Sequence, residues 1–194
     1  MIIRHNPSNL GKWNKHYEGV EAPDHRYGRD GITYRKAAEF LADCDVVEDW
    51  GCGVGTFRLY FKNNYIGIDG SCSKFADVIT DLATYRSSAD GILLRGVLEH
   101  NVQWEAILNN ALASARHKLI IILFTPFVET TRIIAYYNKI DVPDIAFSKH
   151  DLIRHFDHEQ WTLEEGLVTD TQYRIEHIFR ITRPEPTGAQ SSAL

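Results

Sequence analysis

The residues best suited to chemistry lie in two short segments of the chain. Residues 46–55, Val-Val-Glu-Asp-Trp-Gly-Cys-Gly-Val-Gly, form an apolar strand-like run that leads into a glycine-rich turn. Residues 65–68 form a second apolar run, which ends in Asp69. Glycines let the backbone turn sharply and approach a ligand closely. A carboxylate at the end of the second strand can bind both hydroxyls of a ribose. The two segments therefore predict a pocket for an adenosine-containing cofactor.

The spacing of the glycines distinguishes two kinds of such cofactor. A dinucleotide turn has the pattern Gly-x-Gly-x-x-Gly, which seats a pyrophosphate at the start of a helix. Here the glycines are Gly51, Gly53 and Gly55, and Thr56 stands at the position of the third dinucleotide glycine. Asp49, two residues before the turn, would repel a pyrophosphate and attract a cationic amino or sulfonium group. The turn therefore favours a cofactor that carries positive charge.

The pattern Asp49-x-Gly51-x-Gly53-x-Gly55 resembles motif I of class I S-adenosylmethionine-dependent methyltransferases, and the resemblance extends over roughly residues 32–125. It implies a Rossmann-like fold and S-adenosyl-L-methionine as the cofactor. It also implies that Asp81 holds the adenine amino group and that the backbone N–H of Leu82 faces a ring nitrogen. The cofactor-binding residues that we predict are Asp49, Gly51, Cys52, Gly53, Gly55, Asp69, Gly70, Asp81, Leu82 and Arg95.

The triplet Leu98-Glu99-His100 follows a later apolar run and is frequent in small methyltransferases of this family. The Pro-Gly-Gly that usually precedes the fifth strand is absent, and Ala-Arg-His-Lys stands there at 115–118. Histidine is the natural base near neutral pH. His100 is therefore the first candidate for removing a proton from an acceptor, and Glu99 would orient it or bind the cofactor side of the loop. The alternative is that His100 only packs and orders that loop.

The predicted substrate-binding residues are Tyr17, Tyr27 and His150. Both tyrosines lie in residues 1–31, a polar and aromatic segment rich in histidine that would form a cap over the acceptor. An ordinary surface position is the alternative for each of them. His150 begins a later helix and is the second choice as a base.

The elements that must position these residues can be inferred from the apolar pattern. Nearly continuous apolar runs predict buried strands, and helical stretches between them indicate a single α/β domain with a mostly parallel, doubly wound sheet. We expect strands at 45–50, 65–68, 77–80, 90–95 and 117–124, and helices near 10–17 and at 32–43, 55–62, 102–116, 128–139 and 148–157. Residues 161–169 and 173–182 predict an antiparallel hairpin at the sheet edge, and 184–194 a disordered tail that ends the 1–183 domain.

One connection is too short for the usual plan. Only seven residues, 70–76, separate Asp69 from the next strand, whereas a parallel crossover normally needs a dozen or more. We therefore expect no full helix there. The adenine side of the pocket would be less covered than usual.

Composition limits the classes of function. The 194 residues carry a net charge of −5 and no cluster of Lys or Arg, which argues against a nucleic-acid partner. Three cysteines without a Cys-x-x-Cys pair indicate reduced thiols, a cytoplasmic protein and no metal site. Asp141 and Asp144 read as a loop rather than as metal ligands. No run is long enough for a membrane span, and we expect a monomer or homodimer.

The leading hypothesis is a methyltransferase that acts on a small-molecule acceptor, with transfer to an oxygen of a sugar or secondary metabolite. One alternative is an RNA or protein methyltransferase. Another is a non-catalytic, nucleoside-binding regulatory subunit.

Overall fold

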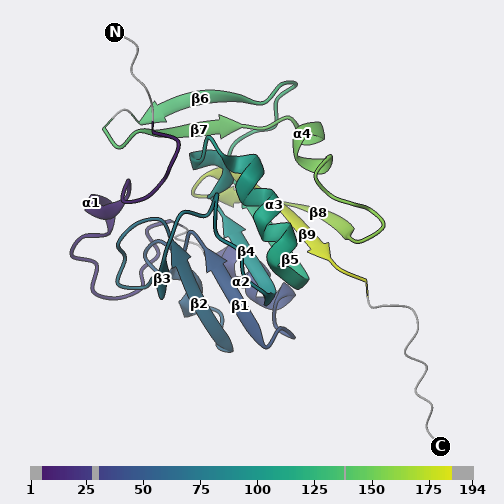
Figure 1. Ribbon diagram of the computed structural model, residues 1–194, viewed down its shortest axis with the longest axis horizontal. Helices are drawn as coiled ribbons and strands as arrows, with labels where there is room; N and C mark the ends of the chain where they lie inside the picture. The colour runs from purple at the N-terminus through teal and green to yellow at the C-terminus, as the bar shows by residue number, and fades with distance from the viewer. Residues whose placement is uncertain (1–5, 28–30, 138, 185–194) are drawn as a thin grey trace, which may run out of the picture.

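A seven-stranded sheet organises the chain in a computed structural model that describes residues 6–27, 31–137 and 139–184 (Figure 1). The strands lie in the order β3-β2-β1-β4-β5-β9-β8. Their bounds are β1 Val46–Trp50, β2 Asn64–Asp69, β3 Val78–Ile79, β4 Ala89–Arg95, β5 Ala115–Leu123, β8 Thr162–Thr171 and β9 Arg174–Thr182.

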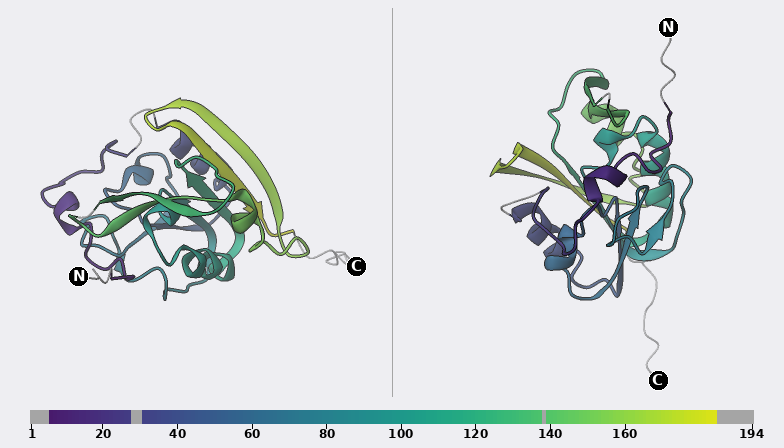
Figure 2. Two further views of the ribbon diagram at one scale, coloured as in Figure 1. Left: turned by 90° about the horizontal axis from the view of Figure 1, so that it is seen from above. Right: turned by 90° about the vertical axis from the view of Figure 1, so that its left-hand side faces the viewer.

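The first five strands are parallel, and the last two form the predicted hairpin. β1 pairs in parallel with both β2 and β4, and β4 pairs in parallel with β5. β9 then runs antiparallel to β5 and to β8, and Figure 2 shows this hairpin as a long curved ribbon at one side of the molecule. The expectation of a mostly parallel Rossmann-like α/β sheet with an antiparallel C-terminal hairpin is confirmed.

Helices cover both faces of the sheet. α2, Ile32–Phe40, packs with Val47, Leu93 and Ile120 in one apolar cluster. α3, Trp104–Ser114, packs with Ile92, Leu119 and Ile121 in the other. Neighbouring residues of a strand thus point to opposite cores, which is why these strands are apolar throughout.

Two helices predicted on the carboxyl side of the sheet differ from the structure: the first is a strand, and the second is shorter than expected. Residues 128–139 were expected to be helical, but β6, Arg132–Tyr137, is a strand that pairs antiparallel with β7, Val142–Ala146. β-branched and aromatic residues favour an extended strand, and Asp141 adopts a left-handed conformation (φ 56°) between the two strands. We call this pair the β6–β7 hairpin. α4 spans only Lys149–Ile153 of the expected 148–157.

The other connections are short. The glycine turn leads into a single 3₁₀ turn, η1, Thr56–Leu59, where a helix over 55–62 was expected. Residues 70–77, all of them described, contain no helix, as predicted. A second 3₁₀ turn, η2, Leu98–His100, follows β4, and α1 is one turn, Asn14–Tyr17. None of the helices in the described ranges combines the length and apolar character of a membrane span. Most of the predicted 184–194 tail lies outside those ranges.

Candidate functional site

The glycine turn after β1 forms the floor of the site. Gly51, Gly53 and Gly55 all adopt left-handed backbone conformations, with φ of 79°, 53° and 72°. A Cβ at Gly51 would come within 2.5 Å of the Val97 side chain. The Gly51 and Cys52 amides donate to the carbonyl of Ile68, at 2.7 and 3.1 Å, so the turn is fixed to the end of β2.

Asp69 joins this turn to the next loop. Its Oδ2 accepts a hydrogen bond from the Gly53 amide at 2.9 Å, and its Oδ1 accepts one from the Ser71 amide at 2.8 Å. Burial raises the pKa of this carboxyl to about 6, although the backbone N–H groups around it favour the charged form. A carboxylate oxygen has two lone pairs, so each oxygen retains capacity for a ligand hydroxyl.

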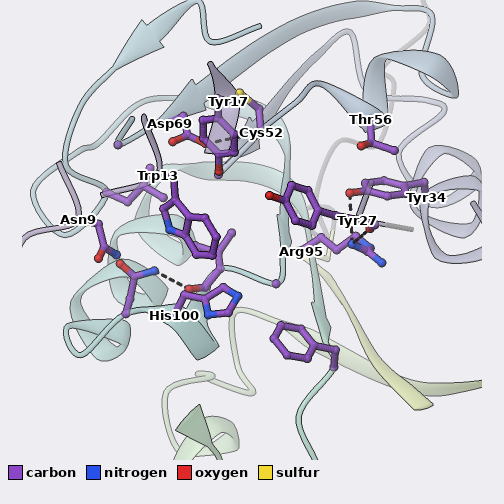
Figure 3. Close-up of a pocket in the computed structure, with 18 of the residues that line it drawn as sticks. Asn9, Trp13, Tyr17, Tyr27, Tyr34, Cys52, Thr56, Asp69, Arg95 and His100 are labelled. Carbon is purple, nitrogen blue, oxygen red and sulfur yellow. Dashed lines mark hydrogen bonds between the residues drawn. The ribbon is translucent and has the colours of Figure 1, made fainter. Parts of the chain in front are cut away.

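A cavity that is partly open to solvent lies above the turn, and its empty space, open solvent included, is about 840 Å³ (Figure 3). Aromatic rings contribute much of the wall, together with polar groups from the ends of β1, β2 and β4. The lining residues are Asn9, Trp13, Tyr17, Tyr27, Tyr34, Gly51, Cys52, Gly53, Thr56, Asp69, Gly70, Leu82, Arg95, Gly96, Val97, His100, Asn101, Phe124 and Tyr173.

Residues 6–27, which we call the N-terminal strap, cover one side of the cavity. The Gly11 amide donates to the Gly70 carbonyl at 2.7 Å, and the Trp13 amide donates to Ser71 Oγ at 2.9 Å. Tyr17 lies over the glycine turn, with its hydroxyl 3.4 Å from the position of a Cβ on Gly53. The strap therefore rests on both loops that carry the site.

The strap also contacts the β6–β7 hairpin. Lys12 Nζ donates to the Asp141 carbonyl at 2.7 Å and lies 3.2 Å from Asp141 Oδ2. Only 9% of the Lys12 side chain is exposed. The Asn6 amide adds a hydrogen bond to Asp141 Oδ2 at 3.0 Å. The strap and the hairpin thus meet through the partly buried ion pair of Lys12 and Asp141. Figure 1 and Figure 2 show the two segments on the same side of the sheet.

His100 lies in the wall of the cavity beside the rings of Trp13 and Phe124, with centroid distances of 5.2 and 5.4 Å. Its Nδ1 lies 3.0 Å from the Pro143 carbonyl oxygen and 3.2 Å from Asp144 Oδ1. Burial lowers the pKa of His100, but Asp144, Glu99 and the Pro143 carbonyl raise it by more, so the net shift is upward. The His100 ring therefore lies between the cavity and the Asp144 carboxylate.

Arg95, at the end of β4, is held by the protein itself. Its guanidinium donates to Thr33 Oγ1, to the Tyr27 carbonyl and to the Tyr34 hydroxyl, and it forms an ion pair with Glu176 on β9. Arg95 lines the cavity, yet its donors are directed at these partners rather than into the open space. It fixes the wall of the site.

Solved structures with the same arrangement identify the fold. No protein-family model and no curated protein matches the sequence. The 1,6-didemethyltoxoflavin-N1-methyltransferase of Burkholderia thailandensis, with bound 1,6-didemethyltoxoflavin and S-adenosylhomocysteine, superposes with a TM-score of 0.62 at 17% identity over 79% of each chain. The chain has the class I methyltransferase fold.

Two further structures show how widely this methyltransferase fold is shared. Magnesium protoporphyrin IX methyltransferase from Synechocystis PCC 6803, with bound S-adenosylhomocysteine, has a TM-score of 0.55 at 14% identity, covering 79% of this chain and 83% of the other. The N-terminal domain of EvdMO1, in the presence of S-adenosylhomocysteine and D-fucose, has a TM-score of 0.55 at 10% identity, covering 92% and 99%. At these identities the comparison shows the fold alone.

Within the methyltransferase fold, most of the predicted cofactor residues meet at the cavity. Its wall contains Gly51, Cys52, Gly53, Asp69, Gly70, Leu82 and Arg95. Asp49 and Gly55 lie behind the turn and are not part of the wall. Asp49 is buried and accepts a hydrogen bond from the Tyr65 hydroxyl at 2.8 Å, and burial raises its pKa to about 7. Asp81 also lies outside the wall, and its Oδ2 accepts a hydrogen bond from the Ser8 hydroxyl of the strap at 2.6 Å.

The predicted catalytic and substrate-binding residues likewise lie partly inside and partly outside the cavity wall. His100, Tyr17 and Tyr27 line the cavity. Glu99 does not: it is fully buried, and its Oε1 accepts a hydrogen bond from the Phe124 amide at 2.7 Å. His150, on α4, is not among the residues of the cavity wall, and 86% of its side chain is exposed.

Sequence reasoning missed several wall residues that come from distant parts of the chain. Phe124 and Tyr173 pack at a centroid distance of 4.9 Å, yet they follow β5 and precede β9. Trp13 was placed only in the aromatic cap segment, without a role in the wall. Asp144 was read as part of a loop, and no local signal in the sequence pairs it with His100. The one usable signal is that residues 1–31 hold three aromatic residues, Trp13, Tyr17 and Tyr27, in a polar segment rich in histidine.

Proposed function

We propose that this protein is an S-adenosylmethionine-dependent methyltransferase that transfers a methyl group to a hydroxyl of a small molecule. The observation that carries the proposal is the Asp69 carboxylate, which is buried at the cavity and held against the amide of Gly53. An acid at the end of the second strand, beside a glycine turn, is the arrangement that recognises a ribose. The bound cofactors of two structures with the same fold support this assignment.

The cavity residues suit S-adenosylmethionine. Asp69 would bind the ribose hydroxyls, and Gly51 and Gly53 leave room for the ligand to approach the backbone because neither has a Cβ. Leu82 offers an apolar surface on the adenine side. For Asp81 to reach the adenine amino group, its carboxylate would have to exchange the Ser8 hydroxyl for the ligand. The N-terminal strap acts as the lid that covers the bound cofactor.

The acceptor side of the cavity suits an uncharged molecule that has an aromatic ring or an apolar face. Its wall carries the rings of Trp13, Phe124 and Tyr173, while the charge of Arg95 is matched by Glu176. Rings of this kind stack on an aromatic acceptor or cover the apolar face of a sugar. The 1,6-didemethyltoxoflavin bound in the Burkholderia enzyme and the D-fucose present with EvdMO1 support a small-molecule acceptor.

His100 is the proposed general base. When bound, S-adenosylmethionine supplies a methyl group on a sulfonium, which passes to the acceptor oxygen and leaves a neutral thioether. The proton of the acceptor hydroxyl goes to the Nε2 of His100. A base of this kind contributes about 10²–10⁴-fold to a rate. The rings around His100 exclude water and orient the acceptor at the nitrogen.

Binding is the first test. Isothermal titration calorimetry of the purified protein should show binding of S-adenosylmethionine and S-adenosylhomocysteine. Asp69→Asn should weaken it by about 1–3 kcal/mol through the lost charged hydrogen bonds. Asp45→Asn removes the same charge from an exposed position before β1 and should leave binding unchanged. Tight binding of NAD, with no binding of either adenosyl compound, would exclude the proposal.

Turnover is the second test. The protein is incubated with S-adenosylmethionine and a panel of hydroxylated aromatic compounds and sugars, and release of S-adenosylhomocysteine is measured. Release that depends on one class of acceptor supports the proposal. Release only with RNA or protein would reassign the acceptor. Cofactor binding without release for any acceptor would favour a non-catalytic, nucleoside-binding subunit.

A further inference from the structure

Asp144 lies beside the imidazole of His100, although 44 positions separate the two residues in the sequence. It belongs to β7, and its Oδ1 lies 3.2 Å from His100 Nδ1. Only 12% of its side chain is exposed, and within the described residues Oδ1 receives no well-aligned hydrogen bond, although the Tyr137 hydroxyl also interacts with this carboxyl. A buried carboxylate oxygen without a well-aligned hydrogen bond is costly, so its position against a histidine ring calls for an explanation.

The carbonyl next to Asp144 fixes the tautomer of the ring. The Pro143 carbonyl oxygen lies 3.0 Å from His100 Nδ1, and a carbonyl only accepts hydrogen bonds. Nδ1 therefore carries the hydrogen in the neutral ring, and the free lone pair lies on Nε2. This is the tautomer that a base needs if Nε2 is to accept a proton.

The charges around His100 come from three elements. Asp144 on β7 and Glu99 on η2 both raise the pKa of His100. Tyr137 on β6 approaches with a ring centroid distance of 6.4 Å, and its own pKa is raised by burial and by Asp144. Glu99 gives one oxygen to the Phe124 amide, whereas Asp144 Oδ1 faces the ring. Asp144 is thus the carboxylate placed to respond when the ring becomes charged.

We propose that Asp144 is the positioning residue of a His100–Asp144 pair. Together with the Pro143 carbonyl it holds the ring with Nε2 free to act, and its charge stabilises the imidazolium that forms when the acceptor hydroxyl gives up its proton. The role in turnover rests on the proposed function, but the tautomer and the charge coupling are properties of the protein alone. The β6–β7 hairpin therefore belongs to the active site as well as to its cover.

Nuclear magnetic resonance tests the pair without any acceptor. His100→Gln identifies the ring signals of His100 among the nine histidines. In the wild-type protein, ¹⁵N shifts of the ring should show the hydrogen on Nδ1. In Asp144→Asn the pKa of His100 should fall, because the variant keeps the shape of the side chain and loses its charge. Asp170→Asn removes one charge from an exposed position near the end of β8 and should leave that pKa unchanged.

Two results would overturn the pair: a hydrogen on Nε2 in the wild-type ring, or the same His100 pKa in Asp144→Asn as in the wild type. Both readings are independent of cofactor binding, which calorimetry follows separately. The pair can therefore fail while S-adenosylhomocysteine still binds, and the methyltransferase proposal can fail while the pair stands.

Turnover then separates positioning from a structural role. With the acceptor found in the panel, His100→Gln should lower kcat by about 10²–10⁴-fold. Asp144→Asn should lower kcat by about tenfold or more, but by less than His100→Gln does. The acid limb of its pH–rate profile should move to lower pH, with KM nearly unchanged. A variant that loses stability but keeps the acid limb of the wild type would show that Asp144 only supports the fold.

Discussion

Arg95 Nη2 lies 2.6 Å from Glu176 Oε1, and only 6% and 2% of the two side chains are exposed. The pair joins the end of β4, in the cavity wall, to the start of the antiparallel strand β9. Glu176 also accepts a hydrogen bond from the Thr33 hydroxyl on α2 at 3.3 Å. One buried ion pair thus connects a central parallel strand, the hairpin and a helix at the site.

Breaking this pair should destabilise the fold strongly. Glu176→Gln leaves the guanidinium of Arg95 buried without its counter-charge, and the loss should be about 3 kcal/mol of unfolding free energy. Urea denaturation measures it. Glu105→Gln is the matched control, because its partner Arg154 lies at 3.0 Å on the surface with both side chains half exposed, and such pairs contribute about 0–1 kcal/mol. Equal losses in the two variants would contradict the prediction.

Cofactor affinity should depend on the ionisation of Asp69. Burial raises the pKa of this carboxyl to about 6, so the charged form that accepts hydrogen bonds from ribose dominates above that pH. The affinity for S-adenosylhomocysteine should therefore be full at pH 8 and decrease as the pH falls through 6. Calorimetry across this range measures it. Asp69→Asn should bind more weakly and lose this dependence, whereas a constant wild-type affinity from pH 5 to pH 8 would refute the prediction.

Glu99 should make the cofactor-free protein less stable as the pH rises. Burial raises its pKa to about 7, whereas an unfolded chain releases the proton near pH 4. Between these values the folded state holds the extra proton, so the free energy of unfolding falls with rising pH. Glu99→Gln removes this contribution. Relative to the wild type, the free energy of unfolding of Glu99→Gln should rise between pH 5 and pH 8. A difference between the two proteins that stays constant over this range would mean that Glu99 is ionised throughout.

A side chain at Gly51 should be tolerated much less than one at Gly19. Both glycines have left-handed backbones, with φ of 79° and 74°. A Cβ at Gly51 meets the branched side chain of Val97 at 2.5 Å, while a Cβ at Gly19 has nothing within 4 Å. Gly19→Ala should cost only backbone strain, about 1–2 kcal/mol, and Gly51→Ala distinctly more. Thermal unfolding of the two variants compares them, and similar losses would show that the turn adjusts freely.

The strap should open more often without Lys12. Lys12→Met removes charged hydrogen bonds to Asp141, each worth about 1.5–3 kcal/mol. The amides of Gly11 and Trp13 should then exchange hydrogen about tenfold faster or more, and S-adenosylhomocysteine should dissociate faster. Lys15→Met, at an exposed position of α1, is the control. Equal exchange rates in the two variants would show that the strap is held elsewhere.

The central sheet could be predicted from the sequence because its strands are buried on both faces. The apolar runs at 90–95 and 117–124 became β4 and β5 with shifts of one or two residues at their ends. The β6–β7 hairpin could not be predicted in this way. Its residues 133–137 form a short apolar and aromatic run, and such a run does not distinguish helix from strand by periodicity. The segment becomes a strand because it pairs with β7.

The same division applies to the site. The glycine turn and Asp69 are local patterns with a fixed spacing, and both line the cavity as predicted. His100 was found from the triplet that follows β4. Its partner Asp144 was not, because the contact depends on how the β6–β7 hairpin crosses the end of the sheet. Glu99, next in sequence to His100, points into the core, since neighbouring residues of a tight turn face different directions.

The position of the strap decides where an affinity tag belongs. Asn6 already contacts Asp141 through its amide, so a tag joined at Met1 would emerge only five residues from the lid of the cavity. β9 is antiparallel to β5 and leads away from the site: Thr182 pairs with Lys118 near the start of β5, at the opposite end of the strands from the cavity. A tag joined after β9 would therefore start at the end of the sheet away from the site, whereas one joined ahead of the strap would start beside the cavity.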